Sequence, residues 1–279
     1  MPRRPRLLTT LRRTLAAFRD HNASRFGAAL AFYIVFTIAP TLLIAIAVAG
    51  SLFGRIRAEQ AILDRISGSF GSAAGTAIAA MIRSAAPRRA GWLATTLGIT
   101  TLLFGLGGVY RQVDDALRTI WRKRPDRDRG MLHMVRKRLA SMLLVGVTGA
   151  VVLLSVLADA AIALTGKFAA ERLAGGEPVW HVAQLLVSTL VLTALFAALF
   201  RYLAEVEVTA HDVGLSAAVT AVLFVIGKFA VGIYLGKAAV GSAFGAAGSV
   251  VVVLLWAYWS AQIFFFGLEL THVYATSDA

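Results

Sequence analysis

The sequence feature that most constrains this chain is a long stretch without any charged residue, from Ala28 to Phe53. A helix needs about 20 apolar residues to cross the hydrocarbon core of a bilayer, and only helices or closed barrels satisfy the backbone there. Further apolar runs follow, and they are too long and continuous for barrel strands. The sequence therefore predicts an all-α, polytopic membrane protein. We expect six transmembrane helices, at about residues 28–53, 92–110, 139–164, 179–200, 213–234 and 247–270.

The distribution of Lys and Arg predicts how these helices are oriented. The chain has a net charge of +13, and the cytoplasmic flanks of membrane helices are rich in Lys and Arg. With the N-terminus inside, the inner segments hold 18 of these residues and the outer segments nine, leaving aside Lys228 within a span. We expect a transmembrane domain at 27–274 in the bacterial inner membrane, with segment 1–26 and the tail 275–279 in the cytoplasm. Because the charges cluster beside spans, we expect no nucleic-acid partner.

Two amphipathic segments flank the first span. In residues 1–26, arginines alternate with apolar residues at helical spacing, which predicts a helix lying on the anionic inner surface of the membrane. Residues 54–91 are too polar to span, and the SGSFGS sequence within them is typical of a break. We expect two short helices there, on the outer face. The apolar residues that define the N-terminal helix are Leu7, Leu8, Leu11, Leu15 and Phe18.

The sequence shows no recognisable catalytic centre. It contains no Cys, and its five His residues are spread over both faces of the membrane in the expected topology. Asp114 and Asp115 are adjacent, so on a helix their side chains point about 100° apart and do not converge on one phosphate. The glycine-rich GSFGSAAG, GLGG and VGSAFGAAGS stretches lack phosphate-loop spacing and favour close contact between membrane helices. We therefore expect no enzyme activity, no metal site and no cofactor.

Charged residues within the spans are the most informative candidates for function. Such a charge costs at least about 2.5–3.5 kcal/mol at the helix centre, so it usually faces a partner or a cavity. Asp159 lies five residues before the outer end of its expected span, and Lys228 lies six before the end of its own. At 1.5 Å per residue these depths are about 8 and 9 Å, so the side chains can meet at one level. Either the two residues pair or line a shared cavity, or Lys228 alone extends to the outer interface.

Two polar residues of the last expected span, Gln262 and Glu269, lie two turns apart on nearly the same helix face. Glu269 is close to the cytoplasmic end. One interpretation is an ion pair at the interface, with Arg25 or an arginine of segment 111–138. The other is a polar gate at the cytoplasmic mouth, which Gln262 extends into a polar track.

The first expected span contains Pro40, which removes one backbone hydrogen bond and bends a helix. Thr37, one turn earlier, offers a hydroxyl that partly satisfies the local backbone. The pair is either a static kink or a hinge of the kind found in transporters.

A cluster of basic residues precedes the second expected span. Its charges and an interfacial Trp fit an anionic lipid headgroup, or else a basic and aromatic anchor at the membrane interface. The residues are Arg83, Arg88, Arg89 and Trp92.

Four stretches of the chain together resemble one protein family. They are AALAFYIVFTIAPTLL in the first span, YRQVDDALRTIW after the second, YLGKAAVGSAFGAAGSV before the sixth and VVVVLLWAYWSAQIFFFGLELTHVY in the sixth. The last of these carries W-x-Y-x-S-A and G-x-E-L elements and is the most specific. With six spans in this order, the chain resembles the YihY/BrkB family of bacterial inner-membrane proteins. It departs from the family pattern at Lys228, where an apolar, aromatic-rich stretch is usual.

The resemblance implies an inner-membrane protein without a settled biochemical activity. Family members are linked to virulence and serum resistance or are suspected of handling envelope lipids, and an older label as a tRNA-processing ribonuclease is regarded as mistaken. Our functional hypothesis is a transporter-like or lipid-handling envelope protein, with the bilayer and an anionic lipid or lipid-linked substrate as partners. The alternative is a non-transporting scaffold or assembly factor. A water-accessible cavity at Asp159 and Lys228 would favour transport, and a solid core of small residues would favour the scaffold.

Overall fold

The computed structural model describes residues 7–70, 72–85, 92–121, 176–204, 208–237 and 248–277. Within these residues all regular secondary structure is helical, as the sequence predicts. In chain order the helices are α1 (Leu7–Asp20), α2 (Ala23–Phe53), α3 (Arg55–Phe70), α4 (Ser72–Ala85), α5 (Trp92–Ile120), α7 (Gly176–Ala204), α8 (Ala210–Lys237) and α10 (Gly248–Ser277).

Four of these helices, α2, α7, α8 and α10, are long and apolar enough to cross a membrane. Three of them, α2, α7 and α8, each contain one of the six expected spans, and α10 covers the expected span 247–270 from Gly248 onward. The expected span 92–110 is helical too and forms the first part of α5, which is not one of the four. The expected span 139–164 lies outside the described residues. The four candidate spans are Ala23–Ser51, Leu185–Leu203, Ala210–Tyr234 and Val250–Thr276.

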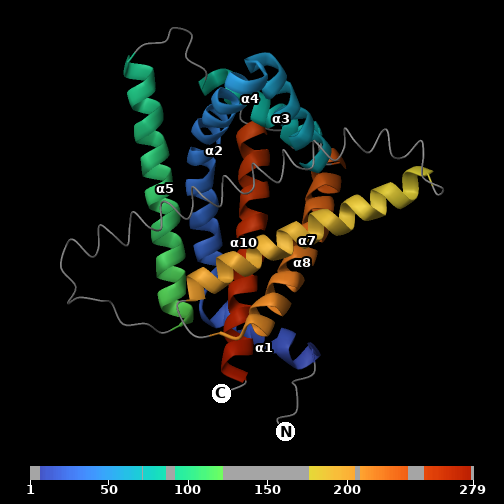
Figure 1. Ribbon diagram of the computed structural model, residues 1–279. Coiled ribbons are helices and arrows are strands. Elements are labelled where there is room, and N and C mark those ends of the chain that lie inside the picture. The colour runs from blue at the N-terminus through green and yellow to red at the C-terminus, as the bar shows by residue number, and fades with distance from the viewer. Residues whose placement is uncertain are drawn as a thin grey trace.

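Figure 1 shows α10 in the middle of the bundle, with the other helices around it. α10 packs against α2 and α8; α2 packs in turn against α5, and α8 against α7. The short helices α3 and α4 lie at one end of the bundle, and α4 contacts α10 there. α1 contacts α10 near the opposite end, where α10 finishes. The N-terminal helix and the α3–α4 pair therefore occupy opposite ends of the bundle.

Local backbone chemistry explains where several helices begin and end. Asn22, at φ 53° and ψ 37°, separates α1 from α2 in the left-handed conformation that Asn tolerates better than most residues. Gly54, at φ 89°, ends α2, and its N–H donates to the carbonyl of Gly50 at 2.9 Å. Thr209 caps α8: its hydroxyl accepts the N–H of Asp212 at 3.4 Å and donates to the Asp212 carboxylate.

Two hydrophobic clusters hold the bundle together, one toward each end. The first lies near α1 and is rich in aromatic rings, and the second joins α3 and α4 to the start of α10. Buried members of the first include Phe26, Ile120, Phe200, Phe265 and Leu268. Buried members of the second include Ile46, Ile78, Ile82, Val252 and Val253.

Helices α2 and α5 approach closely at two glycines of the GLGG sequence. A Cβ at Gly105 would lie 2.5 Å from Cγ2 of Thr37, and a Cβ at Gly108 would overlap the ring of Tyr33. No side chain fits at either glycine without displacing its neighbour on α2. The expectation that these glycines let helices approach closely is confirmed for α2 and α5.

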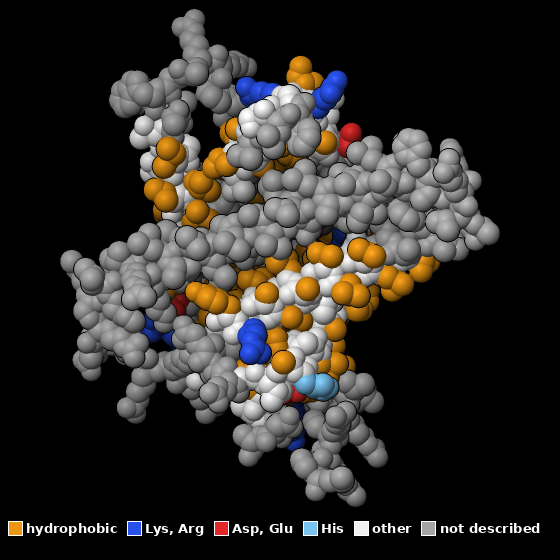
Figure 2. Space-filling model, in the orientation of Figure 1, with side chains coloured by type: hydrophobic (Ala, Val, Ile, Leu, Met, Phe, Trp, Pro, Cys, Tyr) orange, Lys and Arg blue, Asp and Glu red, His pale blue; other side chains and the backbone are white. Residues whose placement is uncertain are grey.

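Large apolar side chains cover much of the outer surface of the described helices. Leu190 of α7 is 71% exposed, and Ile233 of α8 is 59% exposed. On the face in Figure 2, such side chains spread over the described middle of the bundle, whereas most of the described Lys and Arg side chains lie toward its ends. A patch of this extent requires an apolar environment, and a bilayer provides one.

Candidate functional site

The most deeply buried ionisable side chain among the described residues is Glu269, which is completely buried near the end of α10. Its Oε1 lies 2.8 Å from Nδ1 of His21, in the turn between α1 and α2. The contact is a hydrogen bond, and it becomes an ion pair when the imidazole is protonated. Arg25, one of the partners expected from the sequence, instead lies over the ring of Phe26. Oε2 of Glu269 is also buried and has no hydrogen-bond partner in the described parts of the chain.

Further aromatic rings lie near His21 at this end of the bundle. His272, nearly one turn after Glu269, lies 6.4 Å from the His21 ring between centroids and 5.3 Å from the ring of Trp121. These rings bring together the end of α10, the end of α5 and the α1–α2 turn. Across the ranges that the structure describes, no group of three or more His, Asp or Glu residues is arranged to hold a metal ion.

Gln262, two turns before Glu269 on α10, contacts the first residues of α2, next to the turn that holds His21. Its Nε2 donates to the backbone carbonyl of Ser24 at 3.1 Å, and its amide packs against Gly27. Gln262 and Glu269 therefore lie on one side of α10, against the turn and first residues of α2. A polar track or gate through these two residues stays a prediction.

A second polar stripe lies on α8, and the sequence analysis did not single it out. Asp212, Ser216 and Thr220 are all buried. Ser216 donates to the Asp212 carbonyl at 2.8 Å and Thr220 donates to the Ser216 carbonyl at 2.7 Å, so both hydroxyls are satisfied within the helix. The Thr220 hydroxyl also fills the space beside Gly267 of α10. The signal in the sequence was the four-residue spacing of three polar residues in an otherwise apolar segment.

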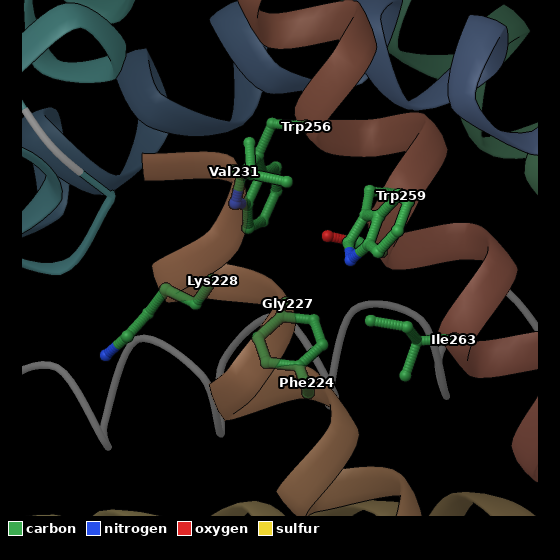
Figure 3. A pocket seen from close by; sticks show the side chains of 8 residues that line it. Phe224, Gly227, Lys228, Val231, Trp256, Trp259 and Ile263 are labelled. Atoms are coloured by element: carbon green, nitrogen blue, oxygen red, sulfur yellow. The ribbon is translucent and has the colours of Figure 1, made fainter. Parts of the chain in front are cut away.

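Lys228 borders a shallow pocket between α8 and α10 that is mostly apolar. Figure 3 shows its amino group pointing away from the rings of Trp256 and Trp259. Nζ lies 5.1 Å from the centroid of the Phe229 ring. Asp159, the expected partner of Lys228, lies outside the described residues, so their pairing stays a prediction. The other residues that line the pocket are Phe224, Gly227, Val231, Ser260 and Ile263.

The candidate hinge in α2 is continuous helix, because α2 runs through Pro40 to Phe53. Pro40 has no N–H for the carbonyl of Phe36, four residues earlier. The hydroxyl of Thr37 donates to the carbonyl of Ile34 at 2.8 Å instead, so it does not satisfy the carbonyl opposite the proline.

The basic cluster before α5 is only partly described. Arg83 is exposed in the last turn of α4, where its charge suits the negative end of the helix dipole. Arg88, Arg89 and the side chain of Trp92 lie outside what the structure describes.

The adjacent carboxylates of α5 have different environments. Asp114 accepts a hydrogen bond from Nε of Arg118 at 2.8 Å, whereas Asp115 is exposed. The hydrogen bond from Arg118 to Asp114 raises the pKa of Arg118 above its ordinary value. Asp114 thus belongs to an ion pair with Arg118 on the helix surface, and Asp115 faces the solvent side of the helix.

Comparison with known proteins agrees with the sequence resemblance. Residues 14–279 match the family described as virulence factor BrkB, and this range includes every described helix from α2 to α10. No curated protein matches the chain, and no solved structure matches it.

Proposed function

Because the chain belongs to the virulence factor BrkB family, we propose that it is a multi-pass protein of the bacterial inner membrane that handles anionic, lipid-like molecules of the cell envelope. Its apolar helices make it an integral membrane protein. Both termini are proposed to be cytoplasmic. The support for this is that α1 and the end of α10 lie at the same end of the bundle, together with the excess of Lys and Arg in the inner segments.

The observation that carries the proposal is the position of Lys228 beside an aromatic pocket. Lys228 lies six residues before Tyr234, the last residue of its candidate span, which corresponds to a depth of about 9 Å. A cation at this depth is costly and is usually retained for a partner or a substrate. An anionic headgroup would bind the ammonium, while an acyl chain would lie along the exposed apolar side chains of α8 and α10 beside the pocket.

The surroundings of the pocket are accessible from the side of the bundle. Trp259 is 45% exposed, and Phe229, beside the Lys228 ammonium, is 54% exposed. A molecule dissolved in the bilayer therefore reaches the pocket laterally, without first crossing an aqueous channel. This favours a lipid-like substrate over a small water-soluble one.

A scaffold or assembly factor is the second candidate, and the glycine contacts favour it. Gly105 and Gly108 pack α5 against α2, and Gly267 packs α10 against Thr220 of α8. Helices in such close contact form a tightly packed interior, which suits a structural protein. A transporter would have to separate these contacts when its helices move.

Purified protein in liposomes that contain fluorescent phosphatidylglycerol separates the two functions. If the protein handles lipid, dithionite will bleach more of the probe than in protein-free liposomes, because inner-leaflet lipid reaches the outside. Lys228→Met removes a charged contact worth about 1.5–3 kcal/mol and should slow bleaching about tenfold or more. Lys228→Arg should retain most of the rate.

Ile233→Met on the same helix is the matched control, because Ile233 is exposed and lies outside the pocket lining. Its rate should equal that of the unchanged protein. Bleaching no faster than in protein-free liposomes would contradict lipid handling and leave the scaffold as the better description.

A further inference from the structure

Among the described side chains of the N-terminal helix α1, two threonines are buried against the bundle and two leucines are exposed. Thr10 and Thr14 are 1% and 0% exposed, whereas Leu11 and Leu15 are 40% and 45% exposed. A surface helix of a water-soluble protein shows the opposite arrangement, with its apolar stripe against the core. The exposed leucines of α1 therefore need an apolar environment outside the protein.

Specific contacts fix the orientation of α1 on the bundle. The hydroxyl of Thr14 donates to the carbonyl of Thr10 at 2.9 Å, whereas the buried Oγ1 of Thr10 has no hydrogen-bond partner among the described residues. The rings of Phe18 and Phe266 lie 6.2 Å apart between centroids. The contact of His21 with Glu269 holds the end of the helix. These contacts leave α1 little freedom to turn its leucines inward.

Arginines border the exposed leucine stripe. At 100° per residue, Arg19 and Arg12 lie about 40° and 60° around the helix from Leu15. Both arginines are exposed. A long arginine side chain beside an apolar stripe extends its guanidinium to the phosphate level while its stem stays in contact with apolar atoms.

The location of α1 matches the boundary of a membrane. α1 ends at Asp20, and the first candidate span begins at Ala23. The helix is thus held at the end of the membrane-crossing part of the bundle, beside the end of α10 (Figure 1). A helix at this level has headgroups and the first acyl carbons within reach of its side chains.

We propose that the face of α1 formed by Leu11, Leu15, Arg12 and Arg19 is a binding surface for the anionic lipids of the adjoining leaflet. The leucines insert at the boundary between headgroups and acyl chains, and the arginines bind lipid phosphates. The charge of the two arginines and the exposed apolar stripe match this partner in both respects. The surface is separate from the pocket at Lys228, so it does not depend on the lipid handling proposed there.

Single spin labels test this surface directly, because the chain has no Cys. Leu15→Cys places a label on the proposed face, and Arg13→Cys places one about 160° away on an exposed position. The labelled protein is placed in nanodiscs of phosphatidylcholine with phosphatidylglycerol. Collisions with dissolved oxygen relative to a water-soluble nickel chelate should be severalfold more frequent at position 15 than at position 13.

The arginines are tested by combining the label at position 15 with Arg12→Gln and Arg19→Gln. This variant should raise nickel accessibility at position 15, and so should nanodiscs of phosphatidylcholine alone. The matched control is Arg55→Gln with Arg57→Gln, which removes two exposed arginines at the opposite end of the bundle and should change nothing at position 15.

Three results would overturn the proposal. Equal nickel accessibility at positions 15 and 13 would place the leucine face in water. Protection of position 15 from both oxygen and nickel would show that a protein, such as a second copy of this chain, covers it. If the label at position 15 prefers oxygen over nickel to the same extent without the two arginines and without phosphatidylglycerol, anionic lipid is not the partner of this surface.

Discussion

Glu269 shows what a single residue reveals in a sequence and what it does not. A carboxylate near the end of an apolar segment is visible in the sequence, and its importance could be inferred from the cost of burying it. Its partner could not. His21 reaches Glu269 because Asn22 takes a left-handed turn that folds α1 back onto α10. The turn depends on one backbone conformation, which apolar periodicity does not encode, so an arginine was the expected partner.

At the residue scale we predict that His21→Ala lowers the free energy of unfolding by about 1–3 kcal/mol, because the buried carboxylate loses its partner. Adding Glu269→Gln should recover part of the loss, since no buried charge then remains. Thermal unfolding in detergent measures both. His211→Ala is the control, because the side chain of His211 is mostly exposed. Equal effects at His21 and His211, or additive losses in the double variant, would contradict the prediction.

At the element scale the sequence located helices better than it located their ends. The expected span 28–53 ends where α2 ends, but α10 runs seven residues past the expected boundary at 270, and α5 ends at Ile120 rather than 110. An apolar run in the sequence marks only the part of a helix that lies in the hydrocarbon core. The backbone hydrogen bonds of the helix can continue beyond that part. In α5 the pair Asp114 and Arg118 supports that extension. The glycines of GLGG were recognised as contact residues, but their neighbours on α2 were not.

Glycine substitutions in α5 test the packing of this element. Ala favours a helix over Gly by about 1 kcal/mol, so Gly98→Ala should be neutral or stabilising, because its Cβ would meet nothing within 4 Å. Gly108→Ala should instead lower stability by about 1–3 kcal/mol, because it forces Tyr33 aside. Melting temperatures in detergent compare the two variants. If the two variants have the same melting temperature, α2 and α5 do not pack as described.

At the scale of the whole molecule, the bundle separates two groups of short helices. α3 and α4 lie at one end, and α1 lies with the end of α10 at the other. The sequence predicted this separation because the expected span 28–53 lies between the amphipathic segments 1–26 and 54–91. The packing alone does not orient the bundle, so our proposal that the α1 end faces the cytoplasm rests on the distribution of Lys and Arg along the sequence.

Single cysteines at the two ends test the orientation of the bundle. Ser72→Cys lies where α3 meets α4, and Thr276→Cys lies near the end of α10; both positions are exposed. An impermeant maleimide added to spheroplasts should label position 72 at once, and position 276 only after the membrane is opened. The reverse order would invert the topology, and labelling of both positions in intact spheroplasts would place the two ends on one side.

The central position of α10 has a mechanical consequence. Its 30 residues make a rod about 45 Å long, which touches α4 near one end and α1 near the other. If this rod pivots about its midpoint by roughly 5°, each end sweeps about 2 Å in opposite directions. A displacement of that size is comparable to the helix shifts by which other proteins switch state. A displacement of α4 in one direction would therefore move α1 in the opposite direction at the other end of the bundle. This coupling would need no solute to cross the membrane.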